Sequence, residues 1–237
     1  MNTTLNAQPG NKTDQEGETM TTSRTENLSS IKGGFLNVGK ILLQVIKTLL
    51  IIYLAFFCYL AIHEWVGHFL ADAIIFARHG TTIETLDVVV QFVSVKMETG
   101  RWTVGLAPFR IGAEVITAYP REMITLTDRE NGFSILWGSG ISTLLSLVFL
   151  IAVNLRKNIQ RFPWFLSAFA MSSMIFDQYL YTFGNTADAL DGAVLMGVNP
   201  VLFKGIVIGL VMVQVWLLLR LVFRYWWGRQ ARPMVNE

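Results

Sequence analysis

The sequence has 237 residues, 52% of them hydrophobic and only 15% charged, whereas soluble globular domains carry about a quarter charged residues. The net charge of +2 is too small to indicate a nucleic-acid partner, and the single cysteine, Cys58, excludes a disulfide within the chain. The composition therefore predicts a membrane protein whose partner is the lipid bilayer, with no nucleic acid.

The first 34 residues are rich in Asn, Thr, Ser, Gln and Glu and contain no early apolar segment. Such a composition cannot bury enough apolar surface to offset the entropy that is lost on ordering. We therefore predict a disordered polar tail over residues 1–34 and no cleaved signal peptide.

Four apolar segments are long enough to cross about 30 Å of hydrocarbon, which takes about 20 helical residues. The first, over about 41–77, exceeds one straight crossing, so it should tilt or project beyond the bilayer. The others lie at about 133–155, 162–183 and 201–226, which defines a transmembrane domain over 35–226 and a basic C-terminal tail over 227–237.

The segment between the first two apolar helices, at about residues 84–120, has a different character. It is rich in Val, Ile, Phe and Thr, and a turn is predicted at Glu98-Thr99-Gly100. Open sheet edges cannot face lipid, so this region should lie at the interface or against the helices. The predicted fold is an all-α polytopic membrane protein with about four transmembrane helices and a small membrane-associated β-hairpin or sheet between helices 1 and 2.

Three ionisable residues, His63, Glu64 and His68, lie within six positions of the first apolar segment. Ionisable residues at membrane depth are costly and usually functional. The two imidazoles would bind Zn²⁺ together with a third ligand and water, and Glu64 would act as the general base and then the general acid. The alternative is a proton relay or hydrogen-bonded packing residues without metal. His79, before Gly80, is interpreted as a helix-boundary residue and not as a ligand.

The spacing of the two histidines differs from the usual zinc motif, in which they are four residues apart. His63 and His68 are five apart, which in a regular α-helix separates their directions by about 140°. A π-bulge would add one residue without breaking the helix and would bring both rings to one side. The sequence therefore predicts a widened turn between His63 and His68, and a straight α-helix there would contradict the metal hypothesis.

The topology places an acidic loop on the same membrane face as the histidines. With four crossings, the loop after the first helix and the loop between the third and fourth helices share one side. The second of these loops, "GNTADALDGAVLMGVNP", carries only two charges, Asp188 and Asp191.

Several segments resemble the site-2 protease family of intramembrane zinc metalloproteases over about residues 47–200. "LAIHEWVGHFLADAIIFARHG" resembles the metal-binding helix of that family, "LWGSGISTLLSLVFLIA" its Gly-containing second helix, and "LDGAVL" the segment with its third zinc ligand. The strand-rich region that follows the first of these segments resembles the family's membrane-associated β-region. "HEWVGH" is itself similar to the H-E-x-x-G-H motif of the dipeptidyl peptidase III family. The chain departs from the site-2 protease family in its histidine spacing and in the shortened run "NTADALDG".

This resemblance implies a zinc metalloendopeptidase that hydrolyses membrane-protein or peptide substrates. It makes Asp191 the third ligand, with Asp188 as the competitor, and it gives Asn185 a role in binding the substrate carbonyl or oxyanion. A turn or cap role for Asn185 is an open alternative. Asp177, in the third apolar segment, would either pair with Arg or Gln or orient a metal ligand. Two other functions stay open: a catalytically silent scaffold of the same fold, and the metal-free proton relay.

Two arguments give opposite orientations in the cell membrane. Basic residues flank the loop between the second and third helices and follow the fourth helix: Arg156, Lys157, Arg161, Arg224, Arg229 and Arg232. The positive-inside rule then places both termini in the cytoplasm and the metal on the opposite side. The family resemblance implies a metal that faces the cytoplasm.

Overall fold

The computed structural model describes residues 15–157, 159, 161–185 and 188–230. Side chains are described from residue 38 onward within these ranges, except for 114–117 and 229–230. The chain forms two units, Met1–Leu49 and Leu50–Glu237. The second unit contains the sheet and every helix after the first, so the account below concerns that unit.

The first helix, α1, covers Gln15–Ala61. Residues 15–34, for which we predicted a disordered tail, are therefore helical in the structure, and residues 1–14 of that tail lie outside the described residues. A helix satisfies its own backbone hydrogen bonds, so it can continue from an apolar segment into a polar one.

Three helical segments of the described residues are long and apolar enough to cross a membrane: Val38–Arg78, Asp128–Leu155 and Pro200–Gly228. The sequence predicted a fourth over 162–183. That region is helical as α4 (Trp164–Ser173), the π-helical η2 (Met174–Leu180) and α5 (Tyr181–Phe183). It is not among the three apolar spans because Asp177, Gln178 and several serines make it more polar.

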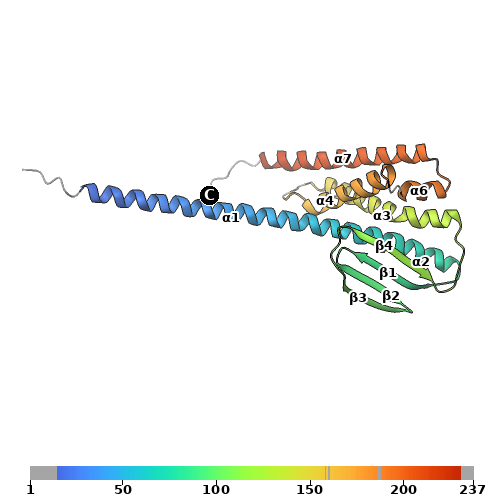
Figure 1. Cartoon of the computed structure of the whole chain (residues 1–237). Helices are drawn as coiled ribbons and strands as arrows, with labels where there is room; N and C mark the ends of the chain where they lie inside the picture. Colours follow the sequence, from blue (N-terminus) through green and yellow to red (C-terminus); the bar gives the residue numbers. More distant parts are fainter. Residues whose placement is uncertain (1–14, 158, 160, 186–187, 231–237) are drawn as a thin grey trace, which may run out of the picture. The chain divides into compact units, whose positions relative to one another are not determined.

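The predicted small sheet after the first helix is confirmed, as a four-stranded antiparallel sheet in the order β3-β2-β1-β4 (Figure 1). Its strands are β1 (Ile83–Val90), β2 (Val93–Glu98), β3 (Arg101–Leu106) and β4 (Ala113–Pro120). Thr99 and Gly100 form the two-residue turn between β2 and β3, both with positive φ, as in a type I′ hairpin.

One face of this sheet packs on the first helix. Leu86, Val88 and Val90 alternate along β1 and are buried, and they join Tyr59 and Phe169 in one apolar core. β1 and β4 contact the helix at the π-helical segment η1 (Ile62–His68), and β4 also contacts α2 (Phe69–Arg78). The sheet therefore lies directly against the segment that carries the histidines.

The helix α3 (Asp128–Leu155) packs closely against two others through glycine. A Cβ on Gly67 of η1 would lie 2.4 Å from the Cα of Gly138, so the two backbones touch there. Likewise, a Cβ on Gly132 would lie 2.6 Å from the carbonyl oxygen of Gly192 in α6 (Asp188–Leu195). α3 thus brings the histidine helix and the acidic helix to the same part of the molecule.

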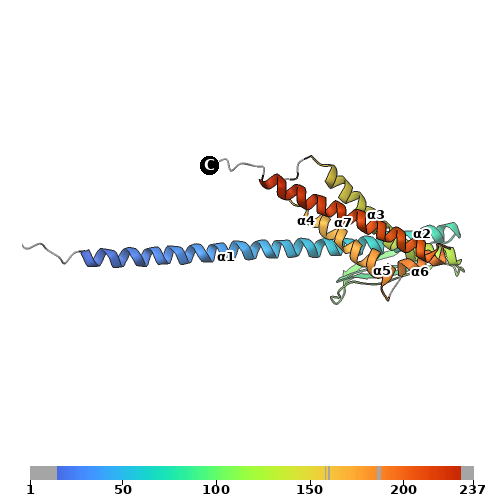
Figure 2. The same ribbon diagram turned by 90° about the horizontal axis from the view of Figure 1, so that it is seen from above.

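The last helix, α7 (Pro200–Gln230), runs alongside α3 and α4 (Figures 1 and 2). Near its C-terminal end, Arg224 donates hydrogen bonds to the carbonyl oxygens of Asn154 and Arg156, at the end of α3. Near its start, Lys204 lies 5.8 Å from the centre of the Phe183 ring, at the end of α5. α3 and α7 are therefore parallel, and α4, η2 and α5 run back between their two ends.

Candidate metal centre

The two histidines lie on a π-helical turn. η1 covers Ile62–His68, and it continues directly from α1 into α2 without a break. The widened turn predicted between His63 and His68 is therefore confirmed. The extra residue directs both rings to one side, and the two Nε2 atoms lie 3.3 Å apart.

This separation fits two ligands of one zinc ion. Two nitrogen atoms bound to tetrahedral zinc, each about 2.0–2.1 Å from the metal, lie roughly 3.3 to 3.4 Å apart. The Nδ1 atoms point elsewhere. His68 Nδ1 lies 2.8 Å from the carbonyl oxygen of Ser134, and His63 Nδ1 lies 2.8 Å from Asp177 Oδ1. The second ring nitrogen of a zinc-binding histidine is usually held in this way, so the two histidines have the geometry of a pair of ligands.

The His63–Asp177 contact is electrostatic more than directional. Its distance is that of an ion pair, but the ring N–H is not aligned for a linear hydrogen bond. Asp177 itself accepts hydrogen bonds from Tyr59 to Oδ1, at 2.7 Å, and from Ser142 and Ser173 to Oδ2, at 2.5 and 2.9 Å. Of the two roles considered for Asp177, the structure places it beside a proposed ligand, His63.

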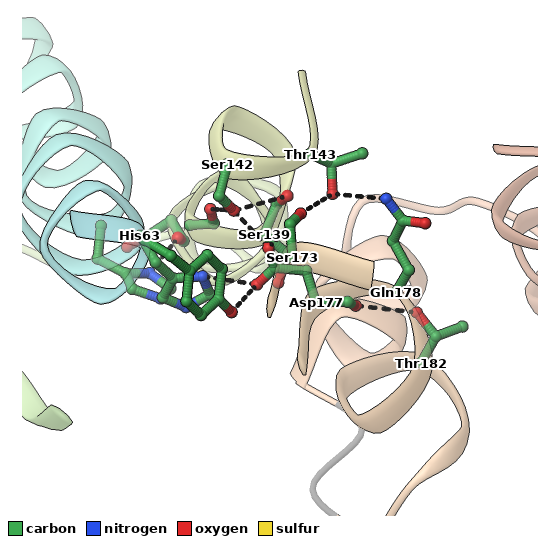
Figure 3. Close-up of polar contacts among 12 residues, drawn as sticks. His63, Ser139, Ser142, Thr143, Ser173, Asp177, Gln178 and Thr182 are labelled. Atoms are coloured by element: carbon green, nitrogen blue, oxygen red, sulfur yellow. Dashed lines mark hydrogen bonds and ion pairs between the residues drawn. The ribbon is translucent and has the colours of Figure 1, made fainter. Parts of the chain in front are cut away.

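Asp177 is part of a polar cluster inside the helix bundle (Figure 3). Ser173 lies 3.4 Å from Thr143, and Gln178 donates to Gln214 of α7 over 3.0 Å. The cluster is buried: Asp177 and Gln178 are each 2% exposed and Gln214 is fully covered. Five elements, α1, α3, α4, η2 and α7, therefore meet at polar side chains next to His63.

The two histidines open onto a pocket of about 330 Å³. Glu64, Tyr181 and Asp188 also line it, together with Asp72 of α2. The half-buried Glu64 therefore lines the same pocket as the two histidines. A water molecule or a substrate carbonyl in this space would meet the histidines and the predicted base together.

The acidic residues of α6 differ in their placement. Both aspartates are exposed, but only Asp188 lines the pocket. Partial burial raises the pKa of the Asp188 carboxyl above its ordinary value, and the charge of Asp191 raises it further. Among the described residues, no three His, Cys, Asp or Glu side chains are grouped closely enough to hold a metal ion. Asn185 is exposed and does not line the pocket.

Sequence reasoning missed Asp72 and Ser134. Ser134 Oγ donates to Asp72 Oδ1 over 2.5 Å, while its carbonyl oxygen is the partner of His68. The spacing held a signal for Asp72, because it follows His68 by four residues and so shares its helix face. Ser134 lies 66 residues from His68 and had no such signal.

Comparisons with known proteins found no match, whether against family models, curated proteins or solved structures. The chemistry of the pocket therefore has to be argued from its own residues.

Proposed function

We propose that the protein is an intramembrane zinc metalloendopeptidase of the site-2 protease type. The observation that carries this proposal is the 3.3 Å approach of the His63 and His68 Nε2 atoms, with both Nδ1 atoms held by oxygen atoms. Two imidazole nitrogens at this distance share either a hydrogen bond or a cation, and with both protons on the Nδ1 atoms, which face oxygen atoms, the two Nε2 atoms carry only lone pairs. A shared cation therefore explains their approach.

His63 and His68 would hold the zinc ion, with Asp188 as the third ligand. Asp188 is preferred to Asp191 because it lines the pocket that both histidines line. When bound, zinc supplies Lewis-acid activation of water at neutral pH. Glu64 would accept the proton of that water and pass it to the leaving amine, which its place in the same pocket allows.

The same proposal includes four membrane crossings. α3 and α7 are parallel, so the chain must return between them, and α4, η2 and α5 supply that return. Phe162, just before α4, lies 5.4 Å from the Tyr225 ring near the end of α7, and Tyr181 lies 5.5 Å from the His63 ring. This helix therefore covers the distance between the two ends of the bundle. The polar side chains of this helix are buried inside the bundle and do not face lipid, so a crossing helix can contain them.

A metal-free proton relay is the second candidate function. It is favoured by the buried contacts that join Tyr59, His63 and Asp177. A relay needs such a chain of titratable groups, but it does not need a pocket with a general base or two Nε2 atoms at ligand spacing. The presence or absence of bound metal separates the two.

Metal analysis of the purified protein tests the proposal. We expect one zinc per chain in the wild type, loss of zinc in His63→Ala and in His68→Ala, and retention in Glu64→Gln. His79→Ala is the matched control, since His79 is the remaining histidine and is paired with Glu130 outside the pocket. In host membranes, new protein N-termini should form with the wild type and not with Glu64→Gln. A wild-type protein without metal would overturn the proposal.

A further inference from the structure

Within the described residues two segments are π-helical, and a side-chain contact joins them. η1 carries His63 and η2 carries Asp177, and the two residues are 114 positions apart in the sequence. The His63 side chain is 5% exposed, and that of Asp177 is 0% exposed. A carboxyl group so completely buried within a helix bundle is costly unless its partners compensate for the lost water.

Both carboxyl oxygen atoms of Asp177 have polar partners. Oδ1 accepts from Tyr59 and faces His63 Nδ1, and Oδ2 accepts from Ser142 and Ser173. Figure 3 shows Ser142 and Ser173 converging on Asp177 from α3 and α4. Three hydroxyl groups on three segments therefore fix where this carboxyl group stands, and the remaining contact is to the imidazole.

We infer that Asp177 is a positioning residue that holds the His63 ring with its proton on Nδ1 and its Nε2 free to bind metal. A carboxylate accepts and does not donate, so an imidazole nitrogen 2.8 Å from it carries the proton. The other nitrogen then has a free lone pair, and this is the atom that lies 3.3 Å from His68 Nε2. Asp177 lies outside the motif "HEWVGH", so the spacing of that motif gives no indication of it.

The inference also links the metal site to the assembly of the bundle. His63 is correctly oriented only when η2 brings Asp177 against it, and Asp177 is itself held by Ser142 of α3 and Ser173 of α4. Metal binding should therefore depend on a residue that does not touch the metal. Loss of such outer partners typically lowers metal affinity about 10- to 100-fold.

The first experiment measures zinc affinity of the full chain in detergent by competition with a chelator. Asp177→Ala should bind zinc about 10- to 100-fold more weakly than the wild type. Asp177→Asn should lose less, because its amide oxygen can still face the Nδ1 proton. The matched control is Gln178→Leu, the next residue of η2, which is equally buried and bonds Gln214 instead of a histidine. It should unfold at a lower temperature and keep wild-type zinc affinity.

The zinc affinity measurement rests on the proposed function. The second experiment is therefore carried out without metal, so that it tests the role of Asp177 independently. The chain has three histidines, so ¹⁵N-histidine NMR in lipid nanodiscs gives three assignable rings. His63 should carry its proton on Nδ1 in the wild type and shift toward the Nε2-protonated form in Asp177→Ala.

The outcomes separate the two proposals. An unchanged His63 tautomer in Asp177→Ala overturns the role of Asp177, whatever the metal result. The same conclusion follows if Asp177→Ala and Gln178→Leu lower zinc affinity equally. A wild type without zinc but with the Asp177-dependent tautomer overturns the protease function and supports the positioning role.

Discussion

At the scale of single residues, the site depends on where side chains are missing as much as on where they are present. A Cβ built on Gly138 would lie 2.4 Å from His68 Nε2, so this glycine makes room for the imidazole. Gly67 meets Gly138 at the backbone, which lets the η1 turn approach α3. The histidine ring and the two glycines therefore form one packing unit.

Gly138→Ala should weaken both folding and metal binding. The new methyl group overlaps the His68 ring, and such overpacking typically costs about 1–3 kcal/mol. Gly140→Ala is the control: it lies on the same helix, is exposed, and has no atom within 4 Å of an added Cβ. The unfolding temperature and the zinc affinity, both measured in detergent, should fall for Gly138→Ala only. Equal behaviour of the two variants would show that the glycine contact is unimportant.

The choice between the two aspartates of α6 is also a question for single residues. Asp188 lines the pocket and Asp191 does not, so Asp188→Asn should reduce zinc affinity by more than about 100-fold, beyond the loss of an outer partner. Asp191→Asn, one helical turn away, should change it little. The opposite result would identify Asp191 as the third ligand, as the family resemblance implies.

At the scale of elements, polar side chains stabilise the end of α2 and the start of α3. Thr127 begins α3 with a capping box: its hydroxyl accepts from the Glu130 amide, and the Glu130 carboxylate accepts from the Thr127 amide. His79, predicted as a boundary residue, ends α2 and pairs with Glu130 over 2.8 Å. This pair holds the exit of the histidine helix beside the start of α3.

Thr127→Ala should lower stability by about 1 kcal/mol, which is the usual loss when a helix cap is removed. Thr125→Ala, in the exposed loop two residues earlier, is the control and should be neutral. Reversible unfolding in detergent measures both. A loss of stability in the Thr125 variant alone would mean that the capping box is not what stabilises this end of α3.

At the scale of the whole molecule, the direction of each helix decides where the pocket lies. α1 and α2 run toward it, α3 runs away, α4 to α5 return, and α7 runs away again. The C-terminal ends of α3 and α7 are joined by the hydrogen bonds of Arg224, and the pocket lies at the opposite end of the bundle. Apolar side chains of α7 such as Ile208, Met212 and Leu219 are left uncovered by protein, as expected for a helix in lipid.

Cysteine labelling from each side of the membrane tests the four crossings. With Cys58→Ser as the background, Arg121→Cys and Asn185→Cys should react on one side and Lys157→Cys on the other. All three positions are exposed loop residues. Labelling of residues 157 and 185 from the same side would mean that α4 to α5 does not cross. The side on which residue 185 reacts also decides between the two orientations that the sequence left open.

The sequence by itself determined the features that depend on neighbouring residues. Hydropathy indicated the three long apolar helices, β-rich composition indicated the sheet, and the five-residue spacing of His63 and His68 indicated the widened turn. These follow from local periodicity and from the cost of polar groups in lipid. The predicted tail over residues 15–34 and the apolar character of 162–183 were the exceptions, because helix continuation and inward-facing polar groups depend on context.

Only the tertiary structure decided what lies beside the histidines. Asp177 and Ser134 are distant in sequence from the rings they contact, and a contact between distant segments leaves no periodic pattern in the sequence. The close glycine contacts on α3 bring η1 and α6 together, and this packing makes Asp188, and not Asp191, line the pocket. A short motif can thus show which residues have the chemistry to bind a metal, but their orientation depends on the helices packed around them.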